Sequence, residues 1–173
     1  MKKFLVLSIF ALLMSWTTIN SHALAIAERD RSVTDFYEIT GKEWKLIEVY
    51  IDREKTQFNR DDFLNETYVE GQTFILHRFS PETFTLTFDE QRLSGTGAPN
   101  RYSAPYTLGD KQTISIMPML STMMAPLFEL ESLREYDFYV YLTGVQKWDL
   151  VNGNFELYSK TEDGREIRLV FGL

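Results

Sequence analysis

Residues of the types that usually do chemistry are few in this chain. It contains no cysteine and two histidines, His22 and His77. A catalytic triad needs a histidine base beside its nucleophile, and a zinc site needs three or four nitrogen or sulfur ligands. Because His77 stands alone in an apolar stretch, we expect no triad and no zinc site. Because the chain has no cysteine, we also expect no cysteine nucleophile.

Carboxylates are abundant, and several pairs lie close together in the sequence: Asp61/Asp62, Asp89/Glu90, Glu129/Glu131, Glu135/Asp137 and Glu162/Asp163. A glycosidase needs two carboxyl groups that face each other across about 5–10 Å. Neighbouring carboxylates at turns or along a helix are typical of solvated charge instead. A hydrolase that uses two converging acids is therefore the least favoured hypothesis. No loop has the ligand spacing of a calcium site, and we expect no metal and no cofactor.

The segment from Gly95 to Asn100 is rich in glycine, but it is not a phosphate-binding loop. It lacks the Gly-Lys-Ser/Thr ending of such loops, and no helix is expected to follow it. We interpret it as a sharp, close-packed crossing between strands. In that setting the Asn100 amide can satisfy backbone groups of the turn, and Arg101 can pair with a carboxylate or lie along aromatic rings.

Four of the six methionines fall close together, at Met117, Met119, Met123 and Met124. Methionine fills irregular gaps in protein cores and also lines adaptable binding surfaces. We expect these side chains to pack in the core, beneath the loop that precedes the helix. The alternative is an apolar pocket between helix and sheet that would hold a lipid or another apolar ligand.

The chain has 173 residues, of which 25% are charged and 44% hydrophobic, and its formal net charge is −7. This length and composition predict one ordinary globular domain. The acidic balance argues against nucleic acid as a partner, because binding to a phosphate backbone needs a basic surface.

The first 25 residues have the features of a secretory signal peptide. Lysines at positions 2 and 3 precede an apolar run over residues 4–14, which is too short to span a membrane. A small-residue A-x-A site ends at Ala25, so we expect cleavage there and no stable membrane span afterwards. The short basic start is typical of bacteria and predicts a periplasmic or secreted protein. Without cysteine the chain cannot be a lipid-anchored lipoprotein.

We predict a loose polar arm over residues 26–40 and one domain over residues 41–173. Alternating apolar, aromatic and β-branched residues predict strands near 44–50, 73–79, 84–88, 91–96, 102–108, 112–117, 145–151, 155–159 and 167–171. Residues 129–142 are the helix candidate, although their second half would suit a strand equally well. Short turns imply antiparallel pairing. The predicted fold class is α+β and mostly β: an antiparallel sheet or open barrel of about eight short strands packed on one helix.

Three segments, in this order and spacing, resemble the META domain family, which includes the HslJ-like heat-shock proteins. They are residues 92–108 (RLSGTGAPNRYSAPYTL), residues 121–126 (STMMAP), and the stretch from Glu135 to Leu157. The resemblance implies an antiparallel β-structure wrapped on a single helix, and no established enzyme activity. Pro99 and Ala125 stand where the family has cysteines, so we expect no disulfide or thiol role at these positions.

The signal peptide, the resemblance and the shortage of catalytic residue types together predict a non-enzymatic, exported META-domain protein of the bacterial cell envelope. We expect a binding or stress-related role, with an unknown protein or an apolar ligand as partner. The alternative is a carrier that holds a lipid or another apolar ligand between helix and sheet. Six residues are expected to form one packed motif surface with a mainly structural role: Asn100, Arg101, Tyr102, Ser121, Thr122 and Met123.

Overall fold

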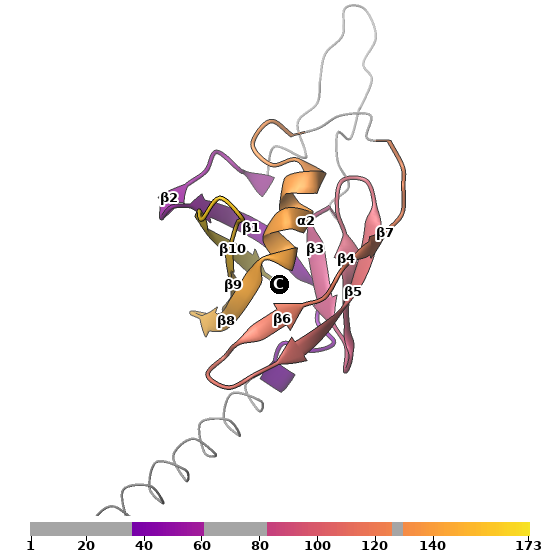
Figure 1. The fold of residues 1–173 in the computed structure, drawn as a ribbon, viewed down its shortest axis with the longest axis vertical. Helices are drawn as coiled ribbons and strands as arrows, with labels where there is room; N and C mark the ends of the chain where they lie inside the picture. The colour runs from indigo at the N-terminus through magenta and orange to yellow at the C-terminus, as the bar shows by residue number, and fades with distance from the viewer. Residues whose placement is uncertain (1–35, 61–82, 126–129) are drawn as a thin grey trace, which may run out of the picture.

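A computed structural model describes residues 36–60, 83–125 and 130–173 of the chain. In these residues an antiparallel sheet bends around one helix, α2 (Glu135–Thr143), as Figure 1 shows. The strands are β1 (Trp44–Ile51), β2 (Glu54–Lys55), β3 (Thr85–Phe88), β4 (Arg92–Thr96), β5 (Arg101–Leu108), β6 (Ile114–Ile116), β7 (Leu120–Ser121), β8 (Val145–Val151), β9 (Asn154–Lys160) and β10 (Glu166–Gly172). The predicted fold class, mostly β on a single helix, is confirmed.

The order of strands in the sheet is β6-β5-β4-β3-β1-β10-β9-β8. Its two ends approach each other, because the Trp148 N–H donates to the Gln112 carbonyl at 2.9 Å and Thr113 forms a bridge with Lys147. The sheet is therefore an eight-stranded barrel that is nearly closed. Two short strands lie off this path: β2 pairs with β1, and β7 pairs with β5 on the edge that β5 also offers to β6.

Aromatic side chains fill the space between the helix and the sheet. The Phe84 and Phe138 ring centroids are 4.9 Å apart, and those of Trp44 and Phe155 are 5.6 Å apart. Such tilted and edge-to-face pairs are the arrangement that aromatic rings prefer. The largest fully buried side chains are Trp44, Trp148, Phe84, Phe88, Phe138, Phe155, Phe171, Ile39, Leu46, Leu86 and Leu93.

The helix begins later than its sequence predicts. The prediction was 129–142, whereas α2 begins at Glu135, directly after Arg134 in an extended conformation (φ −79°, ψ 152°). Leu130 and Leu133 form an isolated bridge just before it, and Leu133 is buried. This apolar turn takes the place of the expected first turns of helix. The ambiguous second half of the segment is helical and buries Phe138, Tyr141 and Leu142.

The described end of the predicted arm, residues 36–40, is part of the core. Phe36 is 2% exposed and Ile39 is 0% exposed. The Phe36 ring lies 5.1 Å from the rings of Phe88 and Trp148, and the Trp44 indole N–H donates to the Ile39 carbonyl at 2.9 Å. The arm prediction is wrong for these residues, because two bulky apolar side chains anchor them. The predicted signal peptide, residues 26–35, the strand at 73–79 and His77 lie outside the described residues.

Candidate functional site

A hydrogen-bonded cluster around Asn100 joins three segments that are distant in the sequence. Glu135, the first residue of α2, accepts hydrogen bonds at one carboxylate oxygen from the backbone N–H groups of Ala98 (2.5 Å) and Asn100 (2.6 Å). Its other oxygen accepts from the Asn100 side-chain amide at 2.6 Å. An acidic residue in the first turn of a helix is favoured by the helix dipole. Glu135 therefore fixes the crossing between β4 and β5 to the start of the helix.

The Asn100 side chain also holds the segment that follows β7. Its Oδ1 accepts hydrogen bonds from the Thr122 hydroxyl (2.8 Å) and the Met124 N–H (2.7 Å), and its Nδ2 donates to the Met124 carbonyl at 3.0 Å. Together with the bond to Glu135, these contacts use both amide donors and both acceptor lone pairs. Asn100 is 6% exposed, so each of these bonds satisfies a group that is shielded from water.

The local sequence makes room for this cluster. A side chain at Gly97 would collide with the Glu135 carboxylate and the Tyr139 hydroxyl. The Tyr139 hydroxyl donates to Glu135 at 3.2 Å, and burial, with the nearby Glu135 charge, raises the pKa of Tyr139 well above its usual value. A glycine is therefore needed where the crossing meets the helix. This agrees with the interpretation of residues 95–100 as a close-packed crossing between strands.

The structure brings together some of the six predicted motif residues and separates others. Asn100 meets the Thr122 side chain, and the Arg101 N–H donates to the Thr122 hydroxyl at 3.1 Å. Tyr102 turns into the core, where its hydroxyl donates to the Thr85 carbonyl at 2.7 Å and burial raises its pKa. The Arg101 side chain is exposed and makes no ion pair within the described residues. These residues therefore do not all share one surface.

The remaining two predicted motif residues lie on an exposed segment. Ser121 pairs with Tyr102 across β7 and β5. Met123 is 97% exposed and contributes nothing to packing. Sequence reasoning placed Glu135 in a family motif and in a carboxylate pair, but it missed that this residue anchors Asn100. The pairing spans 35 positions, and no local pattern could have indicated it.

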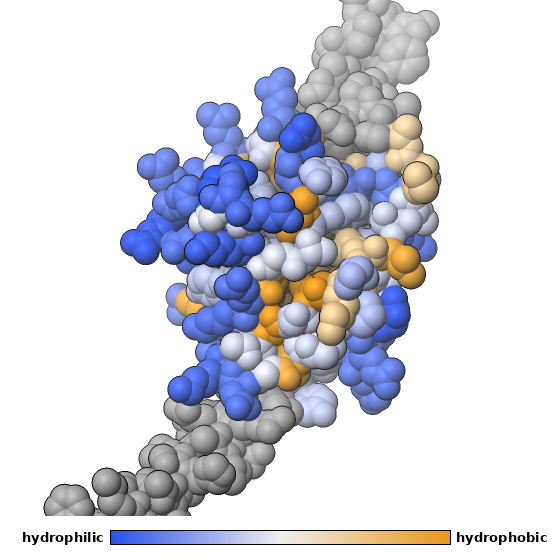
Figure 2. All heavy atoms as spheres, in the orientation of Figure 1, coloured by the Kyte–Doolittle hydropathy of each residue, from blue (hydrophilic) through white to orange (hydrophobic). Residues whose placement is uncertain are grey.

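Residues 117–125, which we call the apolar edge, are exposed apart from Met119. The expectation that the methionines pack in the core is wrong for Met117, Met123 and Met124, and Leu120 between them is 73% exposed. Figure 2 shows apolar residues gathered on the side of the molecule where β6 and β7 lie, while hydrophilic residues dominate the opposite side. The Asn100 cluster therefore holds an exposed apolar segment at the surface.

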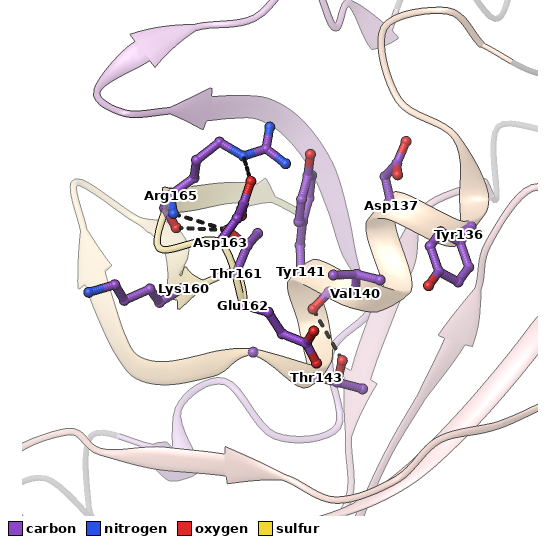
Figure 3. A pocket seen from close by; sticks show the side chains of 11 residues that line it. Tyr136, Asp137, Val140, Tyr141, Thr143, Lys160, Thr161, Glu162, Asp163 and Arg165 are labelled. Atoms are coloured by element: carbon purple, nitrogen blue, oxygen red, sulfur yellow. Dashed lines mark hydrogen bonds and ion pairs between the residues drawn. The ribbon is translucent and has the colours of Figure 1, made fainter.

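A polar cleft of about 580 Å³ lies between α2 and the turn that joins β9 to β10 (Figure 3). Two of its three carboxylates face cations: Asp163 accepts from the Arg165 guanidinium at 3.0 Å, and Asp137 accepts from Arg134 at 2.9 Å. The third is Glu162. Hydrogen bonds, chiefly from Thr161, lower the pKa of Asp163. A general acid needs a raised pKa, so Asp163 is not suited to that role.

A second cleft, of about 600 Å³, has aromatic walls and a polar rim and is lined by Phe36, Tyr37, Thr40, Glu90, Gln91, Tyr106 and Leu108. The Tyr106 hydroxyl donates to the Asp89 carbonyl at 2.6 Å. Burial, with a contribution from the Asp89 charge, raises the pKa of Tyr106 to about 12. Among the described residues, no group of three or more His, Asp or Glu side chains is placed to hold a metal ion. Nor is any helix in these ranges long and apolar enough to cross a membrane.

The fold and the cluster define the class of protein: a nearly closed antiparallel barrel whose central helix is fixed to a strand crossing by a glutamate–asparagine pair. The model of the META domain matches residues 37–170, and the chain belongs to the META domain family. A search of the curated proteins found no match.

Two solved structures are similar to parts of this chain. One is described as the NMR structure of the protein from Burkholderia xenovorans. It is 16% identical, covers 79% of this chain and 85% of its own, and has a TM-score of 0.49. The other is a crystal structure of a DUF4847 family protein from Bacteroides vulgatus. It is 12% identical, covers 76% of this chain and 92% of its own, and has a TM-score of 0.43.

Proposed function

We propose that this META-domain protein is exported to the bacterial cell envelope and works there by binding a partner, without catalysis. The apolar edge is the proposed binding surface. The observation that carries the proposal is that three of the four side-chain hydrogen bonds of Asn100 hold an exposed apolar segment in place. Exposed apolar surface on a small protein usually marks an interaction site.

The charge pattern supports the same surface. No charged residue occurs from Gln112 to Phe128, in a chain where a quarter of the residues are charged. Interface centres are depleted in charge and enriched in methionine and aromatic residues. Of the seven exposed large hydrophobic side chains in the described residues, four lie on the apolar edge: Met117, Leu120, Met123 and Met124.

The absence of catalysis is proposed from the arrangement of acidic side chains. Two of the three carboxylates that line the polar cleft, Asp137 and Asp163, pair with arginines, and Glu135 is occupied by hydrogen bonds within the Asn100 cluster. The alternative function, transport of an apolar ligand between helix and sheet, gains no support, because aromatic rings in contact fill that space in the described residues.

Photo-crosslinking in living cells tests the binding surface. A photo-reactive residue replaces Leu120 on the apolar edge or, as a control, the exposed Glu54 of β2. We expect a discrete crosslinked product from position 120 and none from position 54. Equal products from both positions, or none from either, would contradict the proposal. Cell fractionation with mass analysis tests export, for which we expect an envelope protein that begins at Ile26.

A further inference from the structure

The apolar edge presents backbone hydrogen-bonding groups outward as well as apolar side chains. The Thr122 N–H donates to the Arg101 carbonyl at 3.0 Å, so these two residues form a hydrogen-bonded antiparallel pair. The adjacent pair, Ser121 with Tyr102, is then of the non-hydrogen-bonded kind. In such a pair the N–H and C=O of each residue point away from the neighbouring strand. The backbone groups of Ser121 therefore face away from β5.

Asn100 extends this pattern by two residues. Its side-chain amide binds both the N–H and the C=O of Met124, at 2.7 and 3.0 Å. A side chain thus takes the place of the strand neighbour that Met124 would otherwise need. Met123, between the two inward-facing residues Thr122 and Met124, turns its N–H and C=O outward like Ser121. The Met123 N–H donates no backbone hydrogen bond within the described ranges.

We propose that this edge pairs with the same edge of a second copy of the chain, which makes the second copy the partner in the function proposed above. In an antiparallel pair centred on Thr122, Ser121 exchanges two hydrogen bonds with Met123 of the second copy. Symmetry supplies two more between Met123 and Ser121 of the second copy. An interface built from the same patch on both copies closes on itself and gives a dimer.

Charge and proline placement favour a second copy as the occupant. The chain carries a net charge of −7, and the uncharged run from Gln112 to Phe128 is where two copies repel each other least. An exposed strand edge is usually protected by charged residues or proline. This edge has no charge, and the sequence places Pro118 at its second position and Pro126 directly after its last. Because proline lacks an N–H, pairing is confined to the residues between them.

Sedimentation equilibrium of the protein over a range of concentrations tests the proposal. The protein is used at the length at which it is recovered from its own cells. We expect a monomer–dimer equilibrium. Met123→Pro removes an outward N–H, and Met123→Lys places a charge on each paired strand. Each should weaken self-association by about ten-fold or more. Leu173→Lys is the matched control, since it adds the same charge at an exposed apolar side chain outside the apolar edge and should leave the equilibrium nearly unchanged.

A monomer at every concentration overturns the inference, and so does equal weakening by Leu173→Lys and Met123→Lys. Native mass spectrometry of the protein from its own cells separates this failure from that of the proposed function. A mass of two copies supports the inference. A complex with a different protein contradicts the second copy as occupant while the binding function stands. A monomer without any bound partner contradicts both.

Discussion

Glu135 and Asn100 are bonded twice, once through the Asn100 N–H and once through its side-chain amide, each at 2.6 Å. The pair links the first residue of the helix to the crossing between β4 and β5. Because the same amide holds Met124, the position of the apolar edge depends on a charge at the start of the helix. The stability of the fold and the shape of the proposed binding surface are therefore coupled.

Replacing the Glu135 carboxylate by an amide should be costly. In Glu135→Gln one of the two oxygens becomes an N–H group that faces the N–H donors of Ala98 or Asn100. We expect the free energy of unfolding to fall by about 2–4 kcal/mol, since charge-assisted hydrogen bonds to shielded groups are lost. Asp137→Asn is the matched control in the same helical turn. Its partner Arg134 is exposed, so the loss should be below about 1 kcal/mol. Denaturant unfolding measures both, and equal losses would contradict the role given to Glu135.

Asn100→Asp should make stability depend on pH. It places a second carboxylate beside Glu135, where the Asn100 amide nitrogen lies 2.6 Å from a Glu135 oxygen. Repulsion raises the pKa of one carboxyl in the folded state. A raised pKa in the folded state favours folding at low pH, and this contribution is lost as the pH rises. The deficit of this variant relative to the wild type should therefore shrink on acidification, whereas that of Asn100→Ala should not. Parallel pH profiles for the two variants would contradict the prediction.

Gly95→Ala should destabilise the crossing between strands. A Cβ at Gly95 would collide with the Thr85 carbonyl oxygen and lie 2.8 Å from the Tyr102 hydroxyl. Because the Thr85 oxygen belongs to the backbone, the collision can be relieved only if the strands separate. We expect the free energy of unfolding to fall by about 2–3 kcal/mol. At Gly172 the nearest atom would be an Ile47 side-chain carbon at 3.5 Å, so Gly172→Ala should stay within about 0.5 kcal/mol. Thermal unfolding of the two variants compares them, and similar melting temperatures would count against the close approach at Gly95.

Alkaline pH should destabilise the fold through its tyrosines. Burial raises the pKa of Tyr106 and of Tyr158 to about 12. The folded state favours the neutral phenol of each tyrosine. Its contribution to the free energy of unfolding is therefore fully present below the ordinary tyrosine pKa of about 10 and is lost as the pH rises toward 12. The free energy of unfolding should therefore fall across this window. Tyr106→Phe should make the fall shallower. A wild-type protein whose stability is constant between pH 10 and 12 would contradict the prediction.

The strands were predictable from sequence where burial alternates along the chain. Leu86 and Phe88 of β3 face the core of the protein, and the Asn152–Gly153 turn joins β8 to β9. The short strand β7 was not predicted, because its residues are exposed and carry no alternation. The strand β2 was not among the predicted strands for the same reason, since its two residues are charged and exposed.

The site was less predictable than the fold. The Asn100 amide was expected to satisfy backbone groups of its own turn, whereas it binds the N–H and C=O of Met124 on the segment after β7. Its partner Glu135 lies far along the chain, and only the folded barrel brings the two together. The methionines were misassigned because apolar character alone does not separate a core position from a binding surface. Met123 is exposed because Asn100 binds the backbone of the neighbouring residue, Met124.

Amide hydrogen exchange at Met123 and Met124 tests most directly whether Asn100 sets the apolar edge. In dilute protein we expect slow exchange at Met124, whose N–H donates to Asn100 at 2.7 Å, and fast exchange at Met123, whose N–H faces outward. In Asn100→Ala both amides should exchange fast. Equal rates at the two positions in the wild type, or continued protection of Met124 in Asn100→Ala, would contradict the account.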